Sequence, residues 1–561
     1  GLRFKALASF KNWSSTTNSA SAGWNKYHLQ DFSVDDNGVY SFVTRLQNES
    51  GGEVSTDLKP GVANSGDRRF YFQAIMDYNR TFGKHDVNAM FIYNQDELVT
   101  QLFSGDLIAA LPKRKQGVAA RLSYAYDGKY LAEVNMGYNG SENFAKGHRW
   151  GFFPSIAVGY NISEEAFFEP LKNVFSNMKI RASWGLVGND NIGGARFVYM
   201  PTINLTGTGY TTGLDGDITY KGPVYSRYGN PEVTWEVGKK VNVGLDLQLF
   251  NSLNLTMDYF HETRTDIFQE RGTIPQYLGT AGTKVFGNLA AMKNQGFDFA
   301  ADFNKKIGKD WFISFKGTFT YAHNEITKYD ESPKYAFQSK VGQSANIPSI
   351  MISDGLFKDP DDVKNSNQQI GGNLSAGDIK YVNISKLYGY DDDIVDISDW
   401  VWAKNPTVPE IVYGFGPSIR WKNLDFSFFF QGVAKVSLVM SDFHPFGDNS
   451  LRNVLTWIAD DRWSPDNQNI NATYPRLTRD TSVNNTQRSD YWLRNAAFIK
   501  LKNAEIGYTY KNMRFYVSGM NLATFSPFKH WDPEQGGGNG LKYPTQRVFN
   551  FGFQMTINNN R

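Results

Sequence analysis

Apolar and polar residues alternate with period two along much of the chain. Between positions 130 and 139, the even positions carry Tyr, Ala, Val, Met and Tyr, and the odd positions carry Leu, Glu, Asn, Gly and Asn. The same alternation occurs in residues 241–249, 297–303 and 549–557. Because successive side chains of a strand point to opposite faces of a sheet, this pattern predicts strands with one apolar and one polar face.

Strand length favours a membrane sheet over a soluble sandwich. Several alternating stretches, including the one around residues 69–79, extend over roughly 12–16 residues, whereas strands of soluble proteins usually have about 5–6. A strand tilted across a bilayer needs about 9–11 residues. The stretches are therefore long enough to cross a membrane.

Short and long connections alternate between the predicted strands. Tight turns are expected at residues 82–86, 126–130, 250–254, 306–310, 420–424 and 509–513, and a partly helical connection at 161–177. Long loops are expected at residues 102–115, 138–155, 188–232, 264–294, 324–406, 441–497 and 523–545. Outer-membrane barrels have short periplasmic turns and long extracellular loops. We therefore predict an all-β chain of roughly 16 transmembrane antiparallel strands, an even number, whose last strand runs toward the periplasm.

Composition narrows the class of protein. The 561 residues are 15% aromatic and include 52 Gly, the mean hydropathy is −0.46, and we find no apolar run of the roughly 20 residues that a membrane helix requires. A net charge of +2 argues against a nucleic-acid partner. The absence of cysteine excludes disulfides and thiolate catalysis.

Five segments resemble SusC-like TonB-dependent outer-membrane transporters, the SusC/RagA family of Bacteroidetes. They include the motif HRWGFFPS within residues 138–165, and they continue at residues 178–193, 234–260, 494–510 and 514–526. Their order and spacing agree with the family along nearly the whole chain. The resemblance implies a barrel of 22 strands with a plug domain and a TonB box. We expect residues 1–561 to be the C-terminal barrel portion, with plug and TonB box outside this chain.

The resemblance also implies a function and partners. Family members import oligosaccharides or peptides across the outer membrane, with energy supplied through TonB and with a SusD-like surface lipoprotein as a lid. Two such pairs often form a dimer embedded in outer-membrane lipid. We expect a multi-pass outer-membrane protein that needs no cofactor. A passive porin or adhesin barrel, an outer-membrane barrel hydrolase and a soluble secreted β-protein are the alternatives.

Aromatic side chains in the predicted loops are the candidates for substrate contact. Such rings stack on sugar faces and pack against peptide side chains, although rings in loops also pack against each other. The candidates are Trp400, Trp402, Tyr225, Tyr228 and Trp531.

An acidic run is the candidate for a metal site. It follows AGDIKY (residues 376–381), which matches the family, but it departs from the calcium-loop-like run that the family often has there. Asp391, Asp393 and Asp396 could still give Ca²⁺ the oxygen ligands that it prefers, in an extracellular loop.

Nothing in the sequence points to catalysis. The 7 histidines show no metal-ligand spacing, and we find neither a G-x-S-x-G elbow nor a Walker-type phosphate loop. Carboxylates on polar strand faces, such as Asp246 and Asp258, are expected to line a wet lumen. The motif residues Arg149, Trp150, Gly151, Phe153 and Pro154 are expected to act as scaffolding at the extracellular end of a strand, near the membrane interface. We therefore expect no enzyme.

Overall fold

The computed structural model describes residues 1–46, 55–101, 108, 111–193, 195–275, 283–390, 393–442, 446, 453–478 and 483–557. Among them, no helix is both long and apolar enough to cross a membrane.

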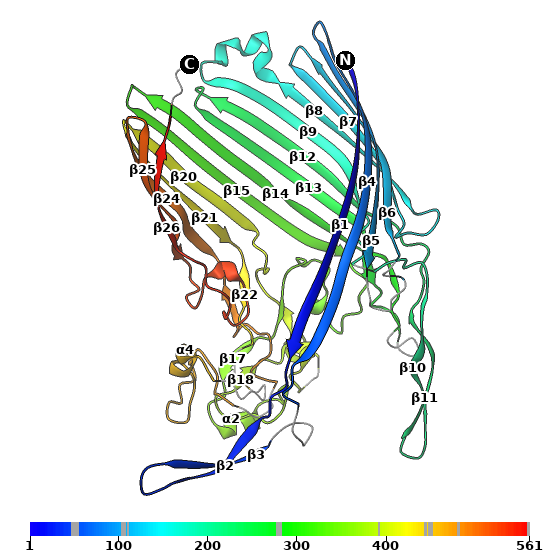
Figure 1. The fold of residues 1–561 in the computed structure, drawn as a ribbon, viewed down its shortest axis with the longest axis vertical. Coiled ribbons are helices and arrows are strands. Elements are labelled where there is room, and N and C mark those ends of the chain that lie inside the picture. The colour runs from blue at the N-terminus through cyan, green and yellow to red at the C-terminus, as the bar shows by residue number, and fades with distance from the viewer. Residues whose placement is uncertain are drawn as a thin grey trace.

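One antiparallel sheet of 16 strands dominates the fold (Figure 1). Each strand between the two edges is hydrogen-bonded to both of its neighbours in the sheet, and β1 and β26 form the edges. In order, the strands are β1(Leu2–Ser21), β4(Lys59–Phe82), β5(His85–Gln101), β6(Lys113–Tyr126), β7(Tyr130–Ser141), β8(Trp150–Asn161), β9(Phe175–Asn189), β12(Glu236–Leu249), β13(Leu253–Glu270), β14(Phe286–Ile307), β15(Trp311–Lys328), β20(Ile411–Trp421), β21(Leu424–Ala434), β24(Phe498–Tyr510), β25(Met513–Phe525) and β26(Val548–Met555). The predicted strand number and antiparallel order are confirmed.

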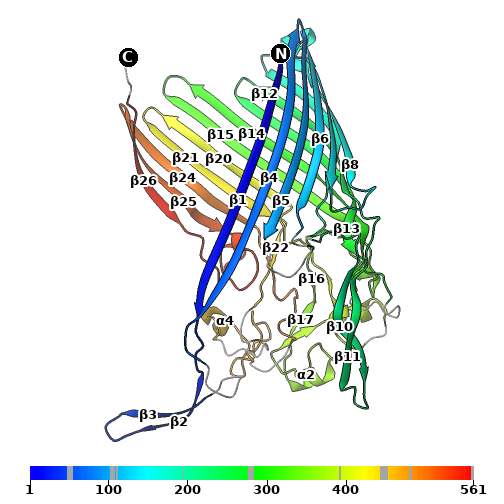
Figure 2. The same cartoon turned by 45° about the vertical axis from the view of Figure 1, so that its right-hand side comes forward.

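The two ends of the sheet differ as predicted. Tight turns join the strands at one end, where η1(Ile162–Glu164) and η2(Ala166–Leu171) fill the longer β8–β9 connection. All long connections lie at the other end, and Figures 1 and 2 show the N-terminus and the end of β26 on the side of the turns. The loop expected at residues 264–294 is shorter than predicted, because β13 continues to Glu270 and β14 begins at Phe286.

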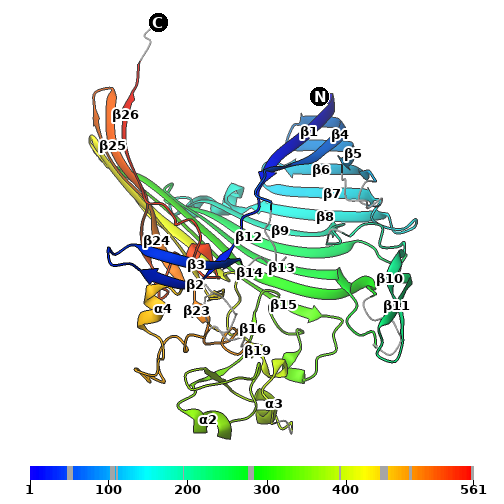
Figure 3. The ribbon, with the colours of Figure 1, turned by 60° about the horizontal axis from the view of Figure 1, so that its bottom comes forward.

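The sheet is curved, as Figure 3 shows. Its two faces have opposite chemistry. Along β7, Tyr130, Val134, Met136 and Tyr138 are 39–48% exposed, and their neighbours on the other face are less exposed. We call the face that carries these apolar side chains the outer face. Polar and charged side chains share the inner face, where a barrel encloses its lumen.

Ion pairs cross the strands on the inner face. Arg181 of β9 donates to Asp258 of β13 at 2.7 Å and to Asp246 of β12 at 3.0 Å. Arg514 of β25 likewise pairs with Asp425 of β21 and Glu505 of β24. These contacts place Asp246 and Asp258 in the wall of the lumen, as expected.

The hydrophobic cores lie in the connections at the loop end. We define the loop assembly as residues 329–410, 435–497 and 526–547, in so far as they are described. It contains the short elements β16(Ser349–Ile350), β17(Ser353–Leu356), α2(Pro360–Asn365), β18(Ile379–Tyr381), α3(Ile384–Leu387), β19(Val401–Trp402), β22(Ser437–Val439), α4(Thr456–Asp460) and β23(Leu493–Asn495). Its buried core includes Ile379, Phe446, Ile458, Trp463, Tyr474 and Trp492.

Two hairpins extend beyond the sheet at the same end. They are β2(Tyr27–Val34) with β3(Tyr40–Leu46), and β10(Thr202–Thr212) with β11(Ile218–Arg227). Figures 1 and 2 show β2 and β3 projecting at the lower left, and Figures 1 and 3 show β10 and β11 projecting at the right.

Candidate functional site

A buried ion pair joins two long loops of the loop assembly. Asp378, in the AGDIKY motif, is fully buried and accepts a hydrogen bond from Arg476 at 3.0 Å. Asn485 donates to the same carboxylate at 2.8 Å, as does the backbone amide of Ser375. A buried carboxylate is stable only when paired in this way, so this contact fixes residues 329–410 against 435–497.

The neighbours of Asp378 reinforce the same junction. Gly377 has φ +84° and lies so close to the Trp463 ring that a Cβ would overlap it. The Tyr381 hydroxyl donates to the Asn484 carbonyl at 2.8 Å, and burial raises the pKa of Tyr381. The AGDIKY motif therefore acts as the link between the two loops.

A buried lysine ties the third loop to the wall. Lys500, at the loop end of β24, is fully buried and contacts Asp532 at 2.6 Å and also Glu534. Burial opposes ionisation of Asp532, but hydrogen bonds from Lys500 and from the Glu534 amide hold its pKa below the usual value. The loop at residues 526–547 is thus anchored on the inner side of the strand end.

Three of the five aromatic candidates lie in the loop assembly. Trp402 donates its indole N–H to the Ser339 carbonyl at 2.9 Å, and Trp400 meets Trp402 edge-on with centroids 4.8 Å apart. Trp531 donates to the Gly536 carbonyl at 3.0 Å and packs against the loop core. Each indole is half-buried and already hydrogen-bonded or packed, so only part of its ring faces outward.

The other two candidates lie elsewhere. Tyr225, in β11, and Tyr228, just after it, stack with centroids 5.0 Å apart. Figures 1 and 3 show the β10–β11 hairpin apart from the loop assembly. The structure does not bring these tyrosines together with the tryptophans. Substrate contact stays a prediction for all five residues.

Sequence reasoning missed one aromatic cluster. His530 stacks on Trp457 with centroids 4.4 Å apart, and its Nε2 lies 3.2 Å from the Tyr474 hydroxyl. These residues come from separate segments of the chain, so no spacing in the sequence signals the contact. Burial, together with nearby Arg494, lowers the pKa of His530, while burial raises the pKa of Tyr474 to about 12.

The acidic run has local partners where it is described. Asp393 pairs with Lys386 at 2.5 Å, and Asp396 caps the short helix η5(Ile397–Asp399) by accepting from the Ser398 amide at 2.6 Å. Asp391 lies outside the described residues. Within the part of the chain that is described, no group of three or more potential ligands could hold a metal ion. The calcium site remains an untested prediction.

Side chains of the HRWGFFPS motif, at the start of β8, contact the loop at residues 190–235. The Arg149 side chain donates from Nε to the Phe144 carbonyl at 3.2 Å, and the Arg149 backbone carbonyl accepts from the Trp235 indole at 3.1 Å. Phe153 packs edge-on against Trp235 with centroids 5.3 Å apart. A second buried cluster surrounds these contacts and contains Phe144, Ile192, Val198, Val233 and Trp235.

The remaining motif residues lie in the sheet. A Cβ at Gly151 would press on the Phe153 ring, and Pro154 lies opposite Met136 of β7. Trp150 stacks on Tyr138 of the outer face with centroids 4.8 Å apart. The scaffolding role of the motif stays a prediction, and these packing contacts support it.

A cavity with both polar and apolar lining residues opens at the loop end of β13, β14 and β15. It has a volume of about 250 Å³. Its strand residues Glu262, Asn294 and Asn324 share the inner face with Asp258 and Asp298, as the strand register shows. It therefore offers hydrogen-bonding groups to a polar solute at the mouth of the lumen.

The chain matches the family model described as "TonB dependent receptor-like, beta-barrel" over residues 2–522. It belongs to that family. It is therefore an outer-membrane β-barrel protein, and the resemblance to SusC-like transporters is confirmed. The family is one of transporters rather than enzymes.

Curated relatives and solved structures agree with this assignment. The chain is similar to TonB-dependent receptor SusC of Bacteroides thetaiotaomicron, with 27% identity over 78% of this chain and 43% of that protein. It is also similar to TonB-dependent receptor P3 of Formosa agariphila, with 25% identity over 89% and 54%. The structure of the RagAB peptide transporter superposes with a TM-score of 0.71 at 20% identity, over 99% of this chain and 60% of that chain. The chain thus spans about half the length of the curated relatives that it matches.

Proposed function

We propose that this chain forms the wall and the outer mouth of an active importer of oligosaccharides or peptides. Transport is energised through TonB and assisted by a SusD-like surface lipoprotein, and two such pairs assemble as a dimer. The observation that carries the proposal is the loop assembly, a folded unit with its own core at the mouth of a polar-lined sheet. A passive pore needs only an opening, whereas capture of a scarce solute needs a shaped surface.

The inner-face carboxylates argue against the hydrolase alternative. Glycoside hydrolysis requires one carboxylic acid that keeps its proton and a second that is ionised. Asp246 and Asp258 instead both accept hydrogen bonds from the one guanidinium of Arg181, so the two side chains that could act as a pair are already bound to a cation in the wall. The described arrangement suits a hydrated wall that solutes pass.

The β2–β3 hairpin supplies a surface for the lipoprotein. Strand register places Tyr27, Leu29, Phe32, Val34, Tyr40, Phe42 and Leu46 on one face, opposite a largely polar face. Phe32 and Phe42 are 57% and 62% exposed, and the hairpin projects beyond the sheet on the side of the long loops. An apolar strip held out in water at the mouth favours burial against a partner protein rather than in lipid.

Uptake by the native host tests the proposal. We expect deletion of the gene to abolish uptake of either fluorescent oligosaccharides or fluorescent peptides, and the full-length gene to restore it. A proton uncoupler should stop the restored uptake, because the outer membrane has no energy source of its own. Unchanged uptake in the deletion strain contradicts import. Restored uptake that ignores the uncoupler supports a passive pore, and turnover by the purified protein supports a hydrolase.

The partner is tested separately by co-purification. Phe32→Ser combined with Phe42→Ser in the full-length protein should reduce the lipoprotein that co-purifies. Ser33→Ala combined with Ser41→Ala, on the opposite face of the hairpin, should leave it unchanged. Equal recovery with both double variants places the partner elsewhere.

A further inference from the structure

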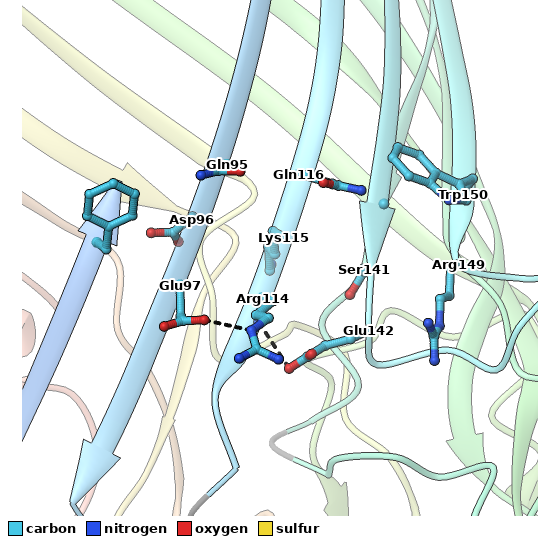
Figure 4. A pocket seen from close by; sticks show the side chains of 12 residues that line it. Gln95, Asp96, Glu97, Arg114, Lys115, Gln116, Ser141, Glu142, Arg149 and Trp150 are labelled. Atoms are coloured by element: carbon cyan, nitrogen blue, oxygen red, sulfur yellow. Dashed lines mark hydrogen bonds and ion pairs between the residues drawn. The ribbon is translucent and has the colours of Figure 1, made fainter. Parts of the chain in front are cut away.

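A groove crosses the outer face of the sheet at the loop end of β4 to β8 (Figure 4). It has a volume of about 520 Å³. Two rows of paired residues form it. One row consists of Gln95, Gln116, Gly140 and Trp150, and the next consists of Phe70, Glu97 and Arg114.

Strand parity places this groove toward lipid rather than toward the lumen. Gly140 lies two positions beyond Tyr138, and Gln95 lies four beyond Phe91, and both aromatic residues are exposed on the outer face. The outer face of β5 and β6 therefore changes from apolar to polar at the Gln95–Gln116 pair. Polar side chains at the end of a lipid-facing band lie at the level of the lipid head groups.

The aromatic boundary of the groove is fixed in place. The Trp150 ring lies over Gly140, so that a Cβ there would be 3.1 Å from the indole, and it stacks on Tyr138. Trp150 is nevertheless 42% exposed. Tryptophan and tyrosine are enriched at membrane interfaces because their rings suit the boundary between lipid and water.

The polar part of the groove combines amides and a guanidinium, which lie beside the carboxylates of Glu97 and Glu142. Gln95 and Gln116 are adjacent amides that can donate to and accept from sugar hydroxyls. Arg114 uses Nε to contact Glu97 at 2.6 Å, and its side chain remains 61% exposed. A guanidinium with free N–H groups binds phosphate oxygens in a fork-like geometry.

From this arrangement we propose that the groove binds the head group of a phosphorylated glycolipid in the outer leaflet. Arg114 binds a phosphate, the amides bind sugar hydroxyls, and Phe70 and Trp150 flank the sugar ring and the first part of the acyl chains. The ligand is an acylated disaccharide phosphate of the lipid A type. This site is distinct from the substrate path, because it lies on the opposite face of the wall.

Lipid binding to the purified full-length protein tests this site. Native mass spectrometry counts the lipids retained after addition of lipid A, of its dephosphorylated form, or of phosphatidylethanolamine. We expect selective retention of lipid A by the wild type. Arg114→Gln should weaken it roughly tenfold, because charged hydrogen bonds are lost. The double variant Gln95→Ala with Gln116→Ala should also weaken the retention of lipid A. This second variant tests the site if Arg114→Gln does not fold.

Arg80→Gln is the matched control. Arg80 shares the outer face of β4 with Phe70 but lies at the turn end, where it contacts the Phe82 ring. Its variant should bind lipid A as the wild type does. Equal binding by wild type and both groove variants overturns the proposal, and so does equal retention of all three lipids. If removal of the phosphate from lipid A weakens its retention by the wild type as much as Arg114→Gln weakens retention of lipid A, the phosphate is bound by Arg114.

Discussion

The wall and the loop assembly bury their apolar residues in opposite places. On the wall, Phe551 is 83% exposed and Val134 is 39% exposed, both on the outer face. In the loop assembly, Phe446, Ile458 and Tyr474 are no more than 1% exposed. The two regions of this chain therefore face different solvents. Lipid covers the apolar face of the wall, whereas the loop assembly, in water, must provide its own core.

Different interactions also stabilise the two regions. Every backbone group within the membrane must be paired, and between the two edge strands the ladders of the 16-stranded sheet pair them. The loop assembly has only short elements and depends on buried side chains and on the polar junction at Asp378. Point substitutions should therefore affect the two regions very differently.

The largest effect is expected at the buried junction of the loops. Asp378→Asn should leave Arg476 with no charged partner for its guanidinium at that junction and destabilise the loop assembly by about 3–5 kcal/mol. Asp393→Asn removes an ion pair whose carboxylate side chain is 75% exposed and should cost less than about 1 kcal/mol. Hydrogen exchange of the full-length protein measures both. Equal protection of the loops in the two variants would contradict a structural role for Asp378.

A second, smaller effect should distinguish the two faces of the wall. Val134→Lys places a charge toward lipid in the middle of β7 and should destabilise the folded protein by about 2–4 kcal/mol. Asn135→Lys, one residue along, points to the inner face and should be nearly neutral. Urea titration in lipid vesicles measures the difference. If the two variants are equally stable, the assigned faces are wrong.

The smallest effect concerns acidification of the loop assembly. Because the folded-state pKa of His530 lies below about 6.5, its value in an unfolded chain, the neutral ring is favoured by folding. The stability that it contributes is present above about pH 6.5 and is lost as the pH falls through the folded pKa. The protection of the loop amides, after correction for the intrinsic pH dependence of amide exchange, should therefore decrease slightly as the pH falls from about 7.5 to about 5. His530→Phe should abolish this pH dependence, and an unchanged pH dependence in the variant would exclude His530 as its source.

The sequence predicted the wall well because its signal is local. Alternation along residues 130–139 reports the two faces of β7 directly, and turn lengths report the two ends of the sheet. The loop core has no such signal. Contacts such as Tyr474 with His530 join residues 56 apart in the chain, and nothing in the spacing marks them. For the same reason only residue type marks the aromatic candidates in the sequence, and two of the five lie outside the loop assembly.

Alternate-residue labelling tests the division between lipid and lumen most directly. Because this chain has no cysteine, single cysteines can be introduced from Leu131 to Tyr138 of the full-length protein in lipid nanodiscs, with any cysteine outside this chain replaced. We predict that a water-soluble maleimide reacts at positions 131, 133, 135 and 137, and that a lipid-borne quencher affects only labels at 132, 134, 136 and 138. Reactivity that is uniform or has the reverse alternation would contradict the account.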